Sequence, residues 1–200
     1  MGLFTRSSSF SRVTSLAALR PVHAAFSWLH MNPKTIMDWQ AELVAIPAPP
    51  FGEDARCARL AEIFRSAGLS QVTIDEVGNV MGTLRAASLP EESTGPLVIL
   101  SAHLDTVFPA HTPINPTRDG DRLLAPGACD NGAGIAGMLA IAHALIEAKV
   151  ELPVPILFLG LSLPEHGYHA PNEYFDWGQA SGGMKAFAHY FSELAKMENR

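Results

Sequence analysis

The chain has 200 residues, of which 48% are hydrophobic and 17% are charged, so its composition is that of a globular protein with a sizeable core. Its net charge is −6 without a cluster of Lys and Arg, which argues against a nucleic-acid partner. Two cysteines in no metal-type spacing exclude a disulfide framework, and no apolar run has the length expected of a membrane span.

The first 30 residues differ in composition from the rest of the chain. They are rich in Arg and Ser and contain no acidic residue, which is typical of a targeting segment. Arg20 and Pro21 interrupt the apolar stretch that a secretory signal would need. Residues 1–31 are therefore interpreted as a flexible or targeting-like extension, with Met31 as an alternative start, ahead of a domain over 32–200. The expected location is cytoplasmic, or exported or organellar if this extension targets the protein.

Helices and strands alternate along the predicted domain. Apolar residues at helical spacing predict the helices, and apolar or alternating runs predict the strands. The non-alternating runs over 97–102 and 154–160 are expected to be strands buried on both faces. The pattern predicts an α/β layer sandwich, in which a mostly parallel or mixed sheet is flanked by helices. In chain order we expect helices over 36–46 and 53–67, strands over 71–77, 79–84 and 97–102, a turn, a short strand and a glycine-rich connection over 118–132, a helix over 133–148, a strand over 154–160 and a helix over 178–196.

His103 and Asp105 follow the first of the two apolar strands. Residues i and i+2 of a strand point to the same face, so these side chains emerge together. The carboxyl end of a strand is where open α/β sheets place their ligands. An imidazole beside a carboxylate suits a divalent metal ion, with the carboxylate fixing the ring or joining the ligands. A surface histidine that simply hydrogen-bonds an aspartate fits the pattern as well.

Asp130 lies in the glycine-rich segment GACDNGAG, directly before a predicted helix. Gly127, Gly132 and Gly134 are expected to let the backbone crowd around whatever Asp130 holds. Its two carboxylate oxygens could each bind one ion of a two-metal site. The alternative is that Asp130 only caps the helix, which is a common duty of aspartate.

A third candidate, His169, lies in the irregular segment LPEHGYHAPNE. Loops that a rigid scaffold holds in place often carry ligands. His169 precedes Ala-Pro-Asn-Glu and is the sharper candidate, whereas His166 is interpreted as loop surface.

The segments AHLDTVFP, GACDNGAG and HAPNE, in this order, resemble those of a family of zinc-dependent metallopeptidases and deacylases. The family includes glutamate carboxypeptidase, aminoacylase, acetylornithine deacetylase, peptidase T and carnosinase, and the resemblance covers roughly residues 35–196. It implies that His103 binds one zinc ion, that Asp130 bridges two and that His169 binds the other. It also implies that Asp105 orients His103 and that the peptide bond from Asp130 to Asn131 is cis. Cobalt or manganese could replace zinc.

The sequence departs from the family pattern after the strand over 154–160. There the family has two adjacent glutamates, of which one is the general base and the other a zinc ligand. The only Glu-Glu pair here, Glu91–Glu92, precedes His103 and cannot take that place. The family's lid and dimerisation domain is also missing. The chain is therefore interpreted as an internally shortened member, with the apparent deletion near 160–161.

By this resemblance, the expected function is zinc-dependent hydrolysis of amide bonds in small peptides or N-acyl amino acids. Catalytic zinc normally has three protein ligands, and the residues named here supply two for each ion, so the shortened chain is expected to be weakly active or inactive. Glu165, which is close in sequence to His169, could in principle stand in for the missing base. The alternatives are a non-catalytic remnant that binds metal or a full-length relative, and an unrelated α/β module.

Overall fold

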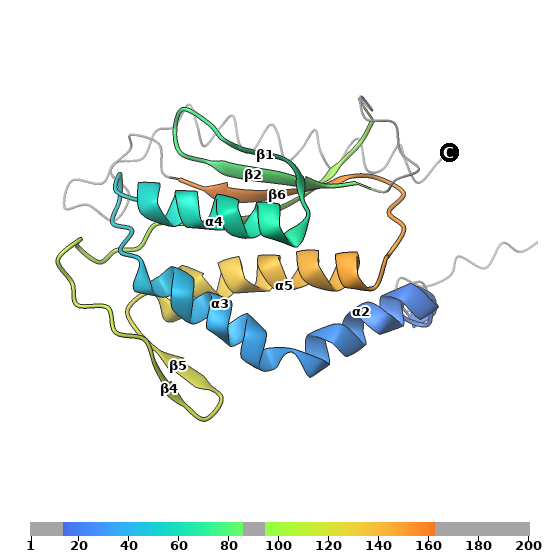
Figure 1. Ribbon diagram of the computed structural model, residues 1–200, viewed down its shortest axis with the longest axis horizontal. Helices are drawn as coiled ribbons and strands as arrows, with labels where there is room; N and C mark the ends of the chain where they lie inside the picture. Colours follow the sequence, from blue (N-terminus) through green and yellow to red (C-terminus); the bar gives the residue numbers. More distant parts are fainter. Residues whose placement is uncertain (1–13, 86–94, 163–200) are drawn as a thin grey trace, which may run out of the picture. The chain divides into compact units, whose positions relative to one another are not determined.

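The structure is a computed structural model that describes residues 14–85 and 95–162 (Figure 1). Its helices are α2 (Arg20–Met31), α3 (Pro33–Ala45), α4 (Asp54–Ala67) and α5 (Gly134–Glu147), the last preceded by the irregular turn η1 (Ala128–Ala133). Its strands are β1 (Ser70–Ile74), β2 (Val80–Leu84), β3 (Val98–His103), β4 (Thr117–Asp119), β5 (Arg122–Leu124) and β6 (Ile156–Leu161). The predicted helix over 178–196 and the loop with His166 and His169 lie outside the described residues.

Four strands form one sheet in the order β1-β2-β6-β3. β3 and β6 are parallel, and their connection runs through η1 and α5. The pairs β1–β2 and β2–β6 are antiparallel, so the sheet is mixed. β4 and β5 form a separate hairpin. The predicted α/β fold, with a mixed sheet flanked by helices, is confirmed.

Helices α4 and α5 pack on the sheet, and α3 and α2 pack in turn on α5 (Figure 1). Between the helices and the sheet lies the apolar core, in which the rings of Phe64 (α4) and Phe158 (β6) meet edge to face with centroids 6.5 Å apart. Among the described residues, Ala128–Glu147 is the one stretch long and apolar enough to cross a membrane. Ile135 and Leu139 within it are buried in this core. The apolar character of α5 is thus explained by its central place between the sheet and α3.

The sequence places the end of α4 correctly. α4 stops at Gly68, which has a φ of 90° and donates its N–H to the carbonyl of Arg65. A residue with a side chain rarely adopts such a φ, so glycine suits this helix end.

Two strand predictions need correction. β3 is not buried on both faces, because Val98 and Ile99 are 46% and 55% exposed while Ala102 is buried. Among the described strands β3 lies at the edge of the sheet. Ile99 points to the face opposite Ala102, whereas Val98 shares the face of Ala102 but lies at the start of the strand, and burial on that face increases toward Ala102. β1 ends at Ile74 rather than at residue 77, because the Asp75 carboxylate accepts hydrogen bonds from the backbone of a turn that follows.

Helix α2 belongs to the segment that the sequence assigned to an N-terminal extension, and it packs on α5. Its Trp28 ring stacks near Trp39 of α3 and His143 of α5, with centroids 6.3 Å and 6.0 Å away. The Trp39 and His143 rings are 4.4 Å apart. Burial lowers the pKa of His143, which favours the neutral ring in this aromatic stack.

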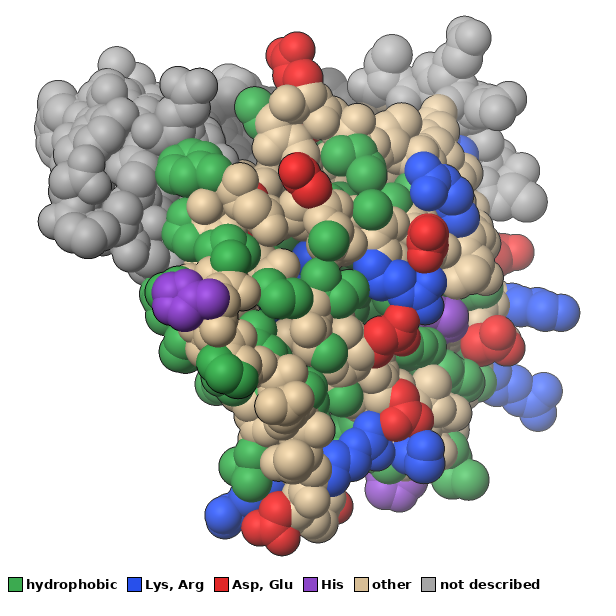
Figure 2. All heavy atoms as spheres, turned by 60° about the vertical axis from the view of Figure 1, so that its left-hand side comes forward, with side chains coloured by type: hydrophobic (Ala, Val, Ile, Leu, Met, Phe, Trp, Pro, Cys, Tyr) green, Lys and Arg blue, Asp and Glu red, His purple; other side chains and the backbone are tan. Residues whose placement is uncertain are grey.

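Basic and acidic side chains lie next to one another on the face that Figure 2 shows. Arg118 of the β4–β5 hairpin forms an ion pair with Asp38 of α3. Arg59 of α4 pairs with Glu42 of α3 at 2.5 Å. These exposed pairs contribute little to stability individually, but they connect the hairpin and α4 to α3.

Candidate metal centre

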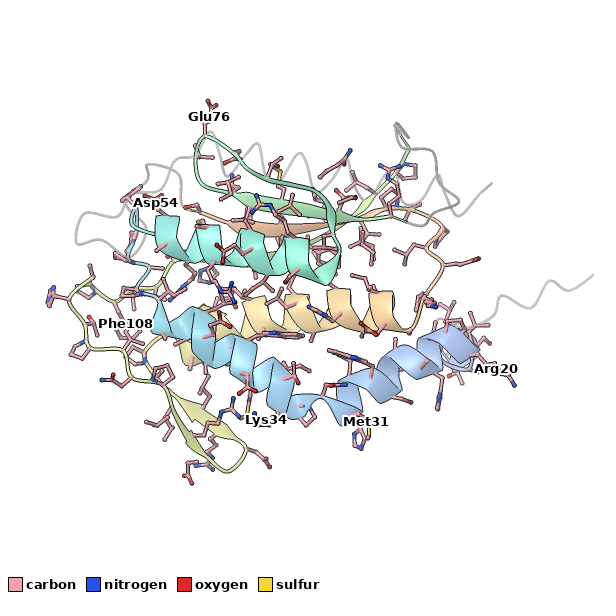
Figure 3. All side chains as sticks on the ribbon, in the orientation of Figure 1. Arg20, Met31, Lys34, Asp54, Glu76 and Phe108 are labelled. Atoms are coloured by element: carbon pink, nitrogen blue, oxygen red, sulfur yellow. The ribbon has the colours of Figure 1, made fainter. Side chains whose placement is uncertain are left out.

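The parallel strands β3 and β6 end at the same edge of the sheet, where α4 and α5 begin (left in Figure 1). Figure 3 shows Asp54, in the first turn of α4, and Phe108, in the loop after β3, at this end. Ligands of α/β sheets bind at the carboxyl ends of strands. The predicted site residues in the described part of the chain all belong to this end.

His103, the last residue of β3, lies between two carboxylates. Its Nδ1 is 2.9 Å from Oδ1 of Asp105, and its Nε2 is 2.9 Å from Oδ1 of Asp130. The Asp105 side chain is 1% exposed, whereas those of His103 and Asp130 are 33% and 77% exposed. Three of the four predicted site residues are therefore in contact, and His169 lies outside the described residues.

Asp130 does not act as a helix cap. η1 and α5 have Gly127 and Ala133 at their N-cap positions, and neither helix start has a side-chain capping bond. The backbone of Asp130 is non-helical, with φ −112° and ψ 99°, and its peptide bond to Asn131 is cis, as the resemblance implied. The capping alternative for Asp130 is therefore wrong, and its carboxylate faces His103 instead.

Both ring nitrogens of His103 face a carboxylate oxygen, so there are more hydrogen-bond acceptors here than a neutral ring has N–H donors. An ionised carboxylate only accepts hydrogen bonds, and a neutral imidazole has a single N–H. If His103 donates from Nδ1 to the buried Asp105, the lone pair of Nε2 faces the carboxylate of Asp130. A second proton or a cation must then lie between these two atoms.

The same pair of atoms suits a metal ion. Zinc binds histidine nitrogen and carboxylate oxygen at about 2.0–2.2 Å with tetrahedral angles, so two such ligands of one ion lie about 3.3–3.6 Å apart. Nε2 of His103 and Oδ1 of Asp130 are 2.9 Å apart, so these two atoms would separate by about half an ångström to hold an ion between them. Within residues 14–85 and 95–162, however, no group of three His, Cys, Asp or Glu side chains is arranged to hold an ion.

Helix α3 holds the turn that carries Asp130. The side chain of Gln40 donates a 2.7 Å hydrogen bond to the carbonyl of Ala128. A Cβ at Gly132 would clash with Val44 of α3 and lie 2.8 Å from the carbonyl oxygen of Gly127. Gly132 thus allows the turn to approach α3, which differs from the expectation that this glycine makes room around a ligand of Asp130.

Replacing Gly132 by alanine is expected to lower the free energy of unfolding by about 1–3 kcal/mol, because the new methyl group overpacks the contact with Val44. Gly137 of α5 is the matched control, since a Cβ there meets nothing within 4 Å. Alanine at Gly137 should raise stability by about 0.5–1 kcal/mol, the usual gain within a helix. Urea denaturation of both variants tests this, and equal effects of the two substitutions would contradict the role of Gly132.

Sequence reasoning missed Arg56, which lies behind the metal centre. Its side chain is 1% exposed and donates a 2.6 Å hydrogen bond to the carbonyl of Leu104, the residue between His103 and Asp105. Burial lowers the pKa of Arg56 to about 10, an effect that the nearby Asp105 opposes. One signal was present in the sequence, because Arg56 shares the inward face of α4 with Leu60 at i+4.

Comparisons with known proteins agree with this fold. The model of peptidase family M28 matches residues 79–193. A curated protein of Pyrococcus abyssi, named as a LysW-lysine/LysW-ornithine hydrolase, is 32% identical over 127 residues, which are 64% of this chain and 32% of the relative. The structure of a tripeptidase from Staphylococcus aureus has 25% identity and a TM-score of 0.57, and the match covers 72% of this chain and 40% of the tripeptidase chain. The structure of aminopeptidase PepT from Bacillus cereus has 24% identity and a TM-score of 0.57, and the match covers 68% of this chain and 38% of that chain. The chain thus spans less than half the length of each.

Proposed function

The chain belongs to peptidase family M28, and on that premise we propose that His103 and Asp130 bind a zinc ion at a site for amide hydrolysis. The resemblance to metallopeptidases that the sequence indicated is thereby confirmed, and the peptidases of this family are metal-dependent hydrolases. The observation that carries the proposal is the pair of carboxylates on either side of the His103 ring, with Nε2 and Asp130 Oδ1 2.9 Å apart.

Each residue has a separate task in this proposal. Buried Asp105 accepts the hydrogen bond from Nδ1–H of His103, which fixes the tautomer and aims the lone pair of Nε2. Asp130, whose carboxylate faces Nε2 of His103, would supply a negatively charged ligand to the same ion. When bound, zinc lowers the pKa of its water to about 7 and polarises the substrate carbonyl. His169 remains the sequence-based candidate for a second ion that Asp130 would share, and cobalt or manganese could take the place of zinc.

As the substrate class we propose small peptides or N-acyl amino acids. Of the relatives named above, one is a tripeptidase and another is named as a LysW-lysine/LysW-ornithine hydrolase. Both names are those of hydrolytic enzymes for substrates that contain amino acids, which supports the class. Because the chain covers 40% or less of each relative, the inference extends to the class of substrate and not to one compound.

Activity of the 200-residue form is proposed to be weak or absent. A catalytic zinc ion normally has three protein ligands, and His103 and Asp130 supply two. Strand β6 leads into Ser162, whose hydroxyl donates to Glu53, and a Glu-Glu pair does not follow it in the sequence. Loss of a general base typically lowers the rate about 10²–10⁴-fold.

The test is metal analysis of the purified 200-residue chain, together with assays on dipeptides and N-acyl amino acids. We expect fewer than two zinc ions per chain, weak retention during dialysis, and turnover close to that of a metal-free sample. Two tightly held zinc ions with sustained turnover would contradict the proposed loss of activity. No binding of zinc, cobalt or manganese at all would contradict the metal site itself.

A second candidate function is a non-catalytic form that binds metal or a full-length relative. One observation favours it: in the described part of the chain, the metal centre lacks a third ligand. Retained metal binding without turnover, in the same experiment, is the result that this candidate predicts.

A further inference from the structure

Arg56 is a buried cation whose hydrogen bonds within the described part of the chain go to backbone carbonyls. Nη1 donates to Leu104 at 2.6 Å, and Nη2 and Nε donate to Ile46 at 2.5 Å and 3.2 Å. Nη2 also lies 3.5 Å from the carbonyl of Val44. The guanidinium group thus joins α4 to the end of α3 and to the backbone just beyond β3.

The hydrogen bond from Arg56 to Leu104 connects Arg56 to the metal centre through the backbone. Leu104 lies between His103 and Asp105, and its N–H donates to the carbonyl of Leu161 in β6. Arg56 holds the carbonyl of the same residue. Because both backbone groups of Leu104 are fixed, the directions in which the flanking side chains leave the chain are fixed as well.

Arg56 also supplies charge where it is needed. Asp105 is buried, and burying an isolated carboxylate is costly unless a cation or hydrogen bonds compensate it. The positive charge of Arg56 interacts electrostatically with the carboxylates of Asp105 and Glu53. The buried carboxylate of Asp105 thus has a cation nearby in addition to its contact with His103.

We propose that Arg56 is a positioning residue for the metal centre, holding Leu104 and Asp105 so that Asp105 fixes His103 with Nε2 directed at the metal ion. The inference rests on the proposed function, because it assigns Arg56 a role toward the ion that His103 and Asp130 would bind. Residues that orient a metal-binding histidine typically change metal affinity about 10–100-fold when they are lost.

The experiment compares Arg56→Met, Arg56→Lys and the control Arg59→Met by cobalt titration calorimetry of the full chain. Arg59 lies on the same helix, but its ion pairs with Glu42 and Glu62 are on the surface. Arg56→Met should weaken cobalt binding about 10–100-fold, and Arg59→Met should leave it unchanged. Arg56→Lys keeps the charge but not the planar fork, so a partial rescue is expected.

A second readout separates positioning from general stability. In the metal-free protein, ¹⁵N NMR of the His103 ring should show a proton on Nδ1 for the wild type and the Arg59 variant, and a partial loss of this proton for Arg56→Met. If the Arg56 variants do not fold, the guanidinium signals of the wild type are followed during zinc addition. A shift for Arg56 but not for Arg59 is expected.

The outcomes distinguish the inference from the function on which it rests. If the wild type binds cobalt and a folded Arg56→Met variant binds it equally well with the same tautomer, the inference is overturned and the metal site stands. An unchanged Arg56 signal at saturating zinc overturns the inference in the same way. If the wild type binds no metal, the proposed function fails and the inference falls with it.

Discussion

Replacing His103 by alanine is expected to lower the affinity for zinc or cobalt by more than about 100-fold, a larger loss than replacing a residue that only orients a metal ligand causes. The variant loses the imidazole whose Nε2 faces Asp130. It also removes the ring nitrogen Nδ1 that contacts the buried carboxylate of Asp105. Titration calorimetry with cobalt measures the loss directly.

His111 provides the control for this substitution. It is an exposed histidine in the loop after β3, at the same end of the domain. His111→Ala should bind cobalt as the wild type does. If the two variants lose affinity equally, or if neither does, metal binding does not depend on the His103 ring and the proposed site is wrong.

Replacing Phe158 by alanine is expected to lower the free energy of unfolding by about 3–5 kcal/mol. Phe158 is fully buried in β6 and meets the ring of Phe64 across the interface between the sheet and α4. Its removal leaves a cavity in the centre of the core, which the neighbouring strands cannot close. Urea denaturation of the metal-free chain measures the change without a contribution from bound metal.

Phe26 of α2 is the matched control, since it is the same residue type at an exposed position. Phe26→Ala should change stability by less than about 0.5 kcal/mol. A Phe158→Ala variant as stable as the Phe26 variant would mean that β6 does not lie in the core as described here.

Much of the fold could be predicted because its elements are encoded locally. The spacing of Leu60 and Phe64 marks one face of α4, and Gly68 marks its end. The burial of β3 could not be predicted in this way, since Val98 and Ile99 have the composition of a central strand. Whether such a strand lies at the edge of a sheet depends on which strands are paired beside it, and its own residues do not encode that.

In the candidate site, too, the features encoded locally could be predicted and the long-range contacts could not. The i, i+2 spacing of His103 and Asp105 predicted that both side chains would point to one face, and the structure places them in contact. The supports for these residues come from far away in the sequence. Arg56 contacts Leu104 across 48 positions, and Gln40 contacts Ala128 across 88. Contacts of this kind depend on how the helices pack on the sheet, so the residues around the metal centre do not reveal them.

The most direct test of the proposed site is anomalous scattering at the zinc absorption edge from crystals of the chain grown with zinc. An anomalous peak is expected within about 2.0–2.2 Å of Nε2 of His103 and of a carboxylate oxygen of Asp130. Nδ1 of His103 should remain bonded to Asp105 in that structure. Zinc peaks that are all remote from His103 and Asp130 would show that these residues do not bind the ion.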